Sequence, residues 1–302
     1  MNLRIEVNDA TELPKENSAD FALEAESLGF DGVGMPDHPH TGQDVFVRLF
    51  EAACITEKVT LFPSVTNPVT RNTSELIDWS KKLNEVAPGR IRLILGGGDN
   101  AVKFFGKRPA TTAELIDAVN KIKTGLIDTG IKVFINASSP KMLEAGGYAA
   151  DGVYAMVGVD PMIINKALEH IHDGARKNTR DPLSIPIAFG LPVFISESRV
   201  KSIEYALPYA FSNFKKFTRV FSQVMKEQIP SLEGIENYSK LSTNQAEQLS
   251  QAIAICGTSE EAAVRTKELG SSLGQNHFIA RVQVNKASPI RALREYGKSI
   301  FP

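Results

Sequence analysis

The sequence predicts a single α/β domain, residues 1–302, folded as a (β/α)8 TIM barrel. Three observations support this prediction. Short apolar runs alternate with amphipathic helical patterns along most of the chain. Parallel strands need crossover helices of this kind, and eight such units occupy about 250 residues. The alternative, a doubly wound open sheet, loses support because no Gly-x-Gly-x-x-Gly follows the first apolar run.

Eight runs have the composition of buried strands. They are rich in β-branched and aromatic residues and are bounded by Gly, Pro, Asn or Asp. They cover residues 3–7, 32–35, 59–65, 90–95, 131–135, 152–157, 185–195 and 277–284. Each of the first seven is followed by helical sequence, which gives the alternation that a barrel requires.

The helices between these strands have recognisable ends. Thr111 and Thr258 each precede a glutamate by three residues, which is the spacing of a capping box. Asp160-Pro161 indicates another helix start, and Gly29 indicates a helix end. One stretch, residues 197–244, is too long for a simple crossover. Its helical patterns at 200–211 and 214–225 predict a helical insertion near the seventh unit, which covers the barrel mouth or contributes to a dimer.

Composition narrows the function classes. The 34 Lys and Arg balance 35 Asp and Glu, which argues against a nucleic-acid-binding protein. No apolar segment is long enough for a membrane span, and Met1 is followed by no secretory signal. Cys54 and Cys256, both in apolar surroundings that indicate core positions, suggest a reducing compartment. We therefore expect a cytoplasmic protein that binds neither nucleic acid nor membrane.

In a barrel of this kind, functional side chains gather at the carboxyl ends of the strands. The residues concerned are 37–40, 64–71, 96–103, 136–141 and 158–160.

Asp37 and His38 follow the second predicted strand, in a segment that places two of the five histidines at one strand end. His38-x-His40 invites a metal-site interpretation, but the remaining histidines lie in a helix or at the wrong strand end, so no metal is expected. A neutral histidine that makes one hydrogen bond to a ligand is the better interpretation. Both residues could also serve only as capping residues of a polar loop.

The glycines at 96–98 allow close approach of a flat or anionic ligand, although Gly-rich turns are common after strands. The loop is too short for a P-loop. Asp99 is either a carboxylate at the mouth or a helix cap. Lys103 and Lys107 could meet an acidic ligand tail or could be ordinary surface lysines. No motif for a nucleophilic serine or cysteine is present.

Several segments, taken in order, resemble the luciferase-like family of flavin- and deazaflavin-dependent oxidoreductases. The string Thr-Asn-Pro-x-Thr-Arg at 66–71 and the Gly-x-x-Pro-Ala-Thr at 106–111 are similar to the branch that includes methylenetetrahydromethanopterin reductase, which uses coenzyme F420. The other matching segments are 25–33, 36–38, 83–85, 88–91, 96–99, 139–143, 149–153 and 257–261. The resemblance is absent from 197–244.

This resemblance implies a ring-binding site at the barrel mouth. It implies a non-proline cis peptide at Ser64–Val65 against the ring, with Asn67 and Gly98 beside it. Asp37 and His38 would lie near the reactive edge. The resemblance also assigns backbone groups near Ser138, Ser139 and Gly158 to the chain or phosphate end. The sequence differs from the family in two respects: Asp99 stands where a glutamate is common, and Asn72-Thr73 stands where a His-Pro pair is common after the arginine.

The leading hypothesis is therefore an oxidoreductase that transfers a hydride between F420 and a small organic substrate. An FMN-dependent luciferase-like monooxygenase and a non-catalytic flavin-binding protein are the alternatives. The family also implies a homodimer. The substrate cannot be inferred from the sequence.

Overall fold

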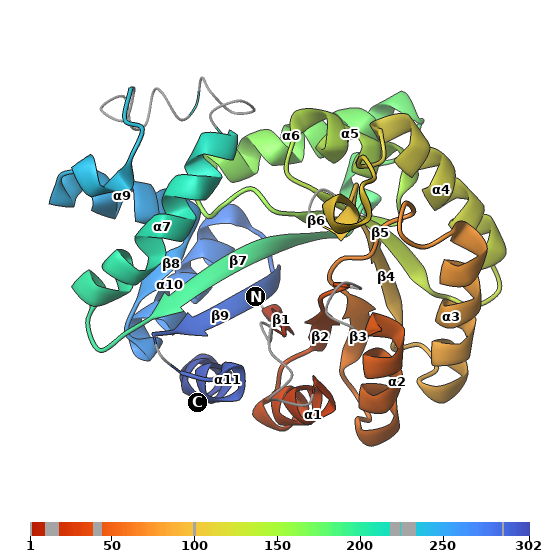
Figure 1. The fold of residues 1–302 in the computed structure, drawn as a ribbon, viewed down its shortest axis with the longest axis horizontal. Helices are drawn as coiled ribbons and strands as arrows, with labels where there is room; N and C mark the ends of the chain where they lie inside the picture. The colour runs from red at the N-terminus through yellow and green to blue at the C-terminus, as the bar shows by residue number, and fades with distance from the viewer. Residues whose placement is uncertain are drawn as a thin grey trace.

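Nine parallel strands form one sheet that curls into a nearly closed barrel (Figure 1). The computed structural model describes residues 2–9, 18–38, 44–98, 101–217, 224, 234–285 and 287–302. The order across the sheet is β3-β2-β1-β9-β7-β6-β5-β4, and β8 pairs with β7. The strands are β1 (Arg4–Asn8), β2 (Gly32–Met35), β3 (Thr60–Pro63), β4 (Arg92–Leu95), β5 (Lys132–Ala137), β6 (Gly152–Ala155), β7 (Ile187–Ile195), β8 (Ile255–Gly257) and β9 (His277–Val284).

The two ends of this order meet between β3 and β4. Isolated parallel bridges join Leu61 to Ile91 and Thr66 to Leu95. The Thr66 N–H donates to the carbonyl of Ile94 at 3.1 Å, and the Gly96 N–H donates to the carbonyl of Thr66 at 2.8 Å. These contacts complete the ring of eight strands, so the predicted TIM-barrel class is confirmed.

The ninth strand, β8, was not predicted. Its three residues pair with Val193–Ile195, the carboxyl-terminal part of β7, while β9 pairs with both β7 and β1. β9 therefore occupies the eighth position in the barrel. β8 is an additional short strand beside the end of β7, and a three-residue apolar run is too short to be distinguished from a helix segment by periodicity.

Helices surround the strands (Figure 1), and their apolar faces bury a continuous core against the sheet. The predicted capping boxes at Thr111 and Thr258 are present, and the Asp160 side chain caps its helix. The helices are α1 (Ser18–Leu28), α2 (Val45–Ile55), α3 (Thr73–Val86), α4 (Thr112–Gly125), α5 (Pro140–Ala149), α6 (Pro161–Lys177), α7 (Arg199–Phe217), α9 (Thr243–Ile253), α10 (Ser259–Leu273) and α11 (Pro289–Ile300), with 3₁₀ turns η2 (Ala101–Phe105), η3 (Pro182–Ser184) and η5 (Tyr238–Lys240).

The barrel interior is filled by a separate apolar cluster. It consists of Phe62, Ile94, Phe134, Tyr154, Ala188 and Ile279, with Val65 packed against it. Below this cluster, toward the amino-terminal ends of the strands, the guanidinium of Arg92 lies 4.2 Å from the Phe62 ring centroid. The cluster closes the barrel below the mouth, so a ligand can enter only from the carboxyl-terminal side.

The seventh unit differs in detail from the prediction. One helix, α7, runs through residues 212 and 213, where two separate helical patterns were expected. Most of the second pattern, 218–225, lies outside the described residues except for residue 224. The boundaries of the predicted insertion, 197–244, stay a prediction.

Cys54 is exposed, so its predicted core position is wrong, whereas Cys256 is buried as expected. Cys54 lies on the outward face of α2, together with Val47 and Phe50. The apolar neighbours of Cys54 in the sequence therefore did not imply burial. Of the helices that the structure describes, none combines the length and the hydrophobicity that a bilayer span requires.

Candidate active site at the barrel mouth

A cavity of about 380 Å³ lies at the carboxyl-terminal end of the barrel. Its wall is formed by the ends of β1, β5, β6, β7 and β9 and by one face of α7. The lining residues that bear on its chemistry are Asn8, Asn136, Ser138, Tyr154, Gly158 and Arg281. Its position is the one where barrel enzymes bind their ligands.

Three polar side chains form the floor of this cavity, directly above the interior cluster. The Asn8 Nδ2 donates to the hydroxyl of Tyr154 at 3.1 Å, across the barrel. Asn136 faces Tyr154 from the adjacent strand, with which it is in register. Among the described residues, neither the Asn8 Oδ1 nor the Asn136 Nδ2 has a hydrogen-bond partner, although both atoms are buried. Burial raises the pKa of Tyr154 above its ordinary value, so its phenol stays protonated at neutral pH.

The end of β3 borders this floor. The peptide bond Ser64–Val65 is cis, as the resemblance implied. A Cβ on Gly34 would come within 2.3 Å of the Asn8 Oδ1 and 2.8 Å of the Ser64 Cβ. A Cβ on Gly96 would lie 2.9 Å from the Val65 Cγ2. Glycine at these two positions lets the Ser64–Val65 segment after β3, here called the β3 bulge, approach the floor closely.

Asn67 and Gly98 are in contact, as expected for residues beside one ligand. Gly98 has φ +90°, and a Cβ there would lie 2.9 Å from the Asn67 Cγ. The Asn67 Oδ1 is used in the local turn, because it accepts from the N–H groups of Val69 and Thr70 at 3.1 and 2.9 Å. Any contact between Asn67 and a ligand must therefore come from other atoms. Asp99 lies outside the described residues.

Asp37 is held by an arginine. The Arg71 Nε and Nη2 donate to its two oxygens at 2.9 and 3.1 Å, and the Thr66 hydroxyl donates at 2.7 Å. All three side chains are buried. Arg71 and Thr66 thus occupy both oxygens of Asp37, which favours a positioning role for Asp37 over that of a proton carrier. His38, the next residue, is half-buried.

Arg71 also connects the mouth to α2 and α3. It donates to Asp44 at 3.1 Å and to Glu75 at 2.8 Å, and its guanidinium lies 5.1 Å from the centroid of the Phe46 ring. Burial alone would lower the pKa of Arg71, but the hydrogen bonds and charge of Asp37, followed by Asp44 and Glu75, raise it above its ordinary value. Phe46 in turn stacks on Trp79, with 5.7 Å between the ring centroids.

The residues expected near the phosphate end are in part brought to the cavity. Ser138 and Gly158 line it, and Gly158 has φ +90°. The hydroxyl of Ser139 caps α5 by accepting from the Met142 N–H at 3.4 Å, and Ser139 does not line the cavity. α5 begins at this edge, and helix amino termini favour anions, whereas the amino terminus of α6 is occupied by the Asp160 carboxylate.

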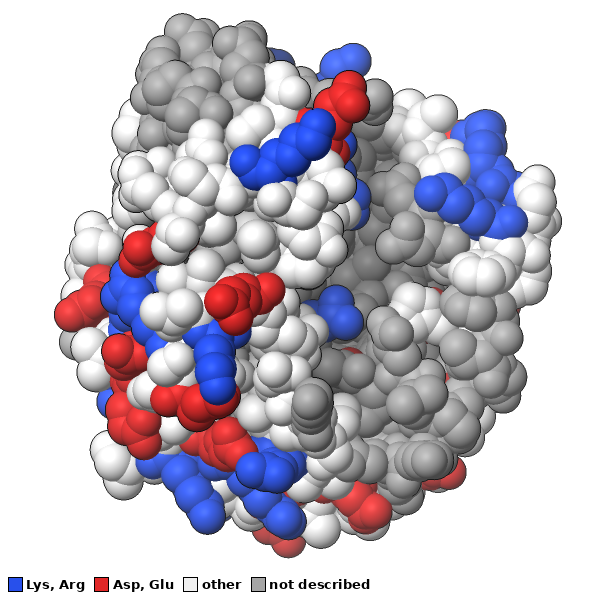
Figure 2. Space-filling model, turned by 60° about the vertical axis from the view of Figure 1, so that its left-hand side comes forward, with Lys and Arg blue, Asp and Glu red and all other residues white. Residues whose placement is uncertain are grey.

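Three basic side chains, Lys103, Lys216 and Arg281, line the same cavity. They come from η2, α7 and β9, and the described lining includes no carboxylate. Figure 2 shows the molecule hollowed near the centre of one face, with Lys or Arg atoms inside the hollow. A wall of this kind suits a ligand that carries negative charge.

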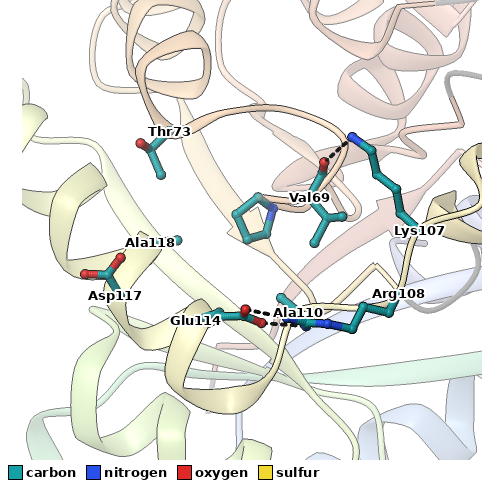
Figure 3. A pocket seen from close by; sticks show the side chains of 9 residues that line it. Val69, Thr73, Lys107, Arg108, Ala110, Glu114, Asp117 and Ala118 are labelled. Atoms are coloured by element: carbon teal, nitrogen blue, oxygen red, sulfur yellow. Dashed lines mark hydrogen bonds and ion pairs between the residues drawn. The ribbon is translucent and has the colours of Figure 1, made fainter.

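Lys107 lies elsewhere. It borders an outer groove of about 480 Å³ between α3 and α4, where its Nζ donates to the carbonyl of Val69 at 3.2 Å (Figure 3). Arg108 pairs with Glu114 in the same groove at 2.6 Å. The predicted role of Lys103 is compatible with the mouth cavity, whereas Lys107 points toward the outer groove.

Sequence reasoning assigned no role to Asn8, Asn136 or Tyr154. Asn136 belonged to the strand-end segments proposed from the sequence, and Asn8 is the last residue of β1. An available signal was the position of both asparagines at the ends of apolar strands. Tyr154 gave no such signal, because an aromatic residue inside a strand is ordinarily core.

Comparison with known proteins places the chain among relatives with the same fold. Residues 4–276 match the family model of the luciferase-like monooxygenases. The 5,10-methylenetetrahydromethanopterin reductase of Methanolobus tindarius is 32% identical over 56% of this chain and 59% of its own length. The F420-dependent glucose-6-phosphate dehydrogenase of Kribbella flavida is 26% identical over 59% of this chain and 64% of its own length. The chain thus spans about three fifths of the length of these curated relatives.

Among solved structures, the coenzyme F420 dependent tetrahydromethanopterin reductase from Methanopyrus kandleri superposes with a TM-score of 0.77 and 19% identity, over 100% of this chain and 99% of that one. At this identity the likeness establishes the fold alone. The family model covers nine tenths of the sequence. The chain belongs to the luciferase-like monooxygenase family.

Proposed function

We propose that this protein is an F420-dependent oxidoreductase that transfers a hydride between F420 and a small organic substrate bound at the barrel mouth. The observation that carries the proposal is the cavity itself. It joins a polar floor, which Gly34 and Gly96 allow the end of β3 to approach, and basic side chains among its lining residues. Support for F420 in particular comes from the relatives and the solved structure whose names contain this coenzyme.

The residues present fit such a coenzyme. Two buried polar atoms at the floor have no hydrogen-bond partner among the described residues, as expected where a ligand completes the site. Ser138, Gly158 and the start of α5 suit a phosphate. Lys103 at the rim suits an acidic tail.

F420, when bound, supplies the carbon that donates or accepts the hydride. The protein has to hold this carbon about 3–3.5 Å from the reacting carbon of the substrate. Val65, at the β3 bulge, would support one side of the ring. His38 would move the accompanying proton, since Arg71 and Thr66 occupy both oxygens of Asp37. Asp37 and Arg71 would then hold Thr66 and the β3 bulge in position.

An FMN-dependent monooxygenase is the second candidate, because the matching family model carries that description. Flavins and deazaflavins share the pyrimidine end of their ring system, so the floor of the cavity suits either. The F420 proposal also includes the predicted homodimer and the roles predicted for the catalytic and cofactor-contacting residues.

The test is a titration of the purified protein with F420 and with FMN, followed by fluorescence quenching at matched concentrations. Tight F420 binding with weak FMN binding supports the proposal. The reverse result supports the monooxygenase. Binding of neither below about 0.1 mM, equivalent to about 5.5 kcal/mol, contradicts both.

A further inference from the structure

The floor of the mouth cavity has a definite hydrogen-bonding pattern that neither the family match nor the named relatives describe. The hydroxyl of Tyr154 accepts the amide of Asn8, so its own proton remains available to a ligand. The Asn8 Oδ1 is an acceptor and the Asn136 Nδ2 a donor, each buried and without a partner among the described residues. The floor therefore offers one acceptor and two donors.

Two buried polar atoms without a hydrogen-bond partner, the Asn8 Oδ1 and the Asn136 Nδ2, are unusual at the bottom of one cavity, because buried polar groups in native proteins are nearly always paired. The described lining of the cavity is otherwise largely apolar or glycine near the floor: Leu191, Pro192, Gly190 and Ile279. A ligand that completes the pattern must present one donor flanked by acceptors. The terminal torsion of an asparagine side chain is soft, so a small rotation brings each amide to the cavity surface.

The pyrimidine end of a flavin or deazaflavin has this arrangement, with one imide N–H between two carbonyl groups. We propose that Asn8, Asn136 and Tyr154 bind this imide edge of the coenzyme. The Asn8 Oδ1 accepts from the ring N3–H, and the Asn136 Nδ2 and the Tyr154 hydroxyl donate to the ring carbonyls. This inference rests on the proposed function, and it assigns cofactor contacts to three residues that the resemblance did not name.

The position of the floor agrees with this assignment. Gly34 brings Asn8 beside Ser64, and Gly96 lies next to both Val65 and Asn136. The imide-binding floor and the β3 bulge expected to support the ring are thus parts of one surface. Ser138 and Gly158 line the same cavity, on the side where the chain end was expected.

The experiment is a double-mutant cycle between protein and ligand. The probes are the deazaflavin chromophore without its phosphate tail and the same chromophore methylated at N3. Dissociation constants are measured by fluorescence quenching for the unmodified protein and for Asn8→Ala. N3-methylation should weaken binding to the unmodified protein about tenfold, the effect of one hydrogen bond. In Asn8→Ala the binding of the unmethylated chromophore should weaken by a similar factor. The loss of affinity caused by N3-methylation should then shrink to about twofold or less.

Asn213→Ala is the matched control. Asn213 lines the same cavity, but its Nδ2 already donates to the carbonyl of Tyr209 at 2.9 Å. This variant should keep the full methylation penalty. Asn136→Asp replaces the donor by an acceptor of the same shape. It should weaken the binding of the unmethylated chromophore about tenfold or more. Thermal unfolding of each variant shows that it is folded.

An equal methylation penalty in the unmodified protein, Asn8→Ala and Asn213→Ala would overturn the inference while leaving F420 binding intact. So would the absence of any penalty in the unmodified protein, which is the outcome expected if ordered water satisfies the two amides. If F420 and both chromophores fail to bind, the proposed function fails together with the inference.

Discussion

Glu6 and Asn8, two residues apart on β1, differ in how their buried side-chain oxygens are paired. At the amino-terminal end of the barrel, Glu6 is fully buried; Arg92 and Arg4 donate to its carboxylate, Arg4 at 2.8 Å, and the His277 Nε2 lies 3.2 Å from the Glu6 Oε2. At the carboxyl-terminal mouth, Asn8 and Asn136 keep unpaired buried atoms. Asn8 lies only two residues after Glu6 and points to the same interior. The fold therefore satisfies the Glu6 carboxylate but not the Asn8 Oδ1, while the Arg92 Nε and the His277 Nε2 at the base also make no hydrogen bond among the described residues.

This difference separates residues that stabilise the fold from residues that bind or act on the ligand. A paired carboxylate stabilises the fold, whereas an unpaired amide lowers stability unless a ligand completes it. Substitutions that remove a partner from a buried charge should therefore lower stability, whereas substitutions of residues that act on the ligand should change binding or turnover. The following predictions test this division.

The largest effect is expected for Arg92→Met at the base. Loss of this cation leaves Glu6 buried with weaker compensation, and we expect a destabilisation of about 3–5 kcal/mol at pH 7. Burial by itself raises the pKa of Glu6, but Arg92, followed by His277, lowers it below its ordinary value. The pair's contribution is therefore present above the ordinary pKa of a glutamate, about 4.3, and is lost as the pH falls below it.

Urea unfolding of the unmodified protein and of Arg92→Met at pH 7 and pH 4 measures this effect. The difference between their free energies of unfolding should be smaller at pH 4. Arg4→Met is the matched control, since Arg4 binds the same carboxylate from an exposed position. It should cost about 1 kcal/mol or less. Equal losses in the two variants would contradict the importance of burial.

At the mouth, His38→Gln should lower kcat by about 10² or more while F420 binding and thermal stability are retained. The measurement follows F420 absorbance with whichever substrate a screen identifies. Asp37→Asn provides the contrast, because it removes the partner of Arg71 and should lower stability by about 1–3 kcal/mol. Full activity in His38→Gln would exclude His38 as the proton carrier.

A smaller effect of opposite sign is expected for Asn136→Leu. An apolar side chain of similar size removes an unpaired donor from the floor, so the free energy of unfolding should rise by up to about 1 kcal/mol, while F420 affinity falls. Chemical denaturation in the absence of ligand tests this. A clear loss of stability would mean that Asn136 has a structural partner and that the contrast between the two ends is weaker than described.

The smallest effect concerns the thiols, outside both ends. Burial raises the pKa of Cys256 to about 12, whereas Cys54 is exposed. A thiol reagent at pH 8 should modify one cysteine per native chain quickly and the second only after unfolding. Rapid modification of both in the native protein would show that the packing of α7 against β8 opens readily.

Much of the fold could be predicted because it depends on local pattern. The strands Gly32–Met35 and His277–Val284 have the predicted bounds, and the capping boxes are where the spacing placed them. β8 and the exposure of Cys54 could not be predicted, since both depend on which elements pack side by side.

The site was predictable to a smaller extent. Strand ends gave the neighbourhood of Asp37, Ser64 and Asn67, and the resemblance gave the cis bond. The cross-barrel contact between Asn8 and Tyr154 joins residues 146 positions apart and depends on strand register. The use of Arg71 to hold Asp37 likewise depends on tertiary contacts, although both residues stood in motifs that were recognised.

The stacking of Phe46 between Arg71 and Trp79 has an optical consequence. Trp79 is the single tryptophan of the chain, so the intrinsic emission excited near 295 nm comes from one position. That indole is connected through the Phe46 ring to the guanidinium that holds Asp37. We therefore expect a change in the order of the mouth to alter this emission, so that a titration of the unlabelled protein reports ligand binding without a dye.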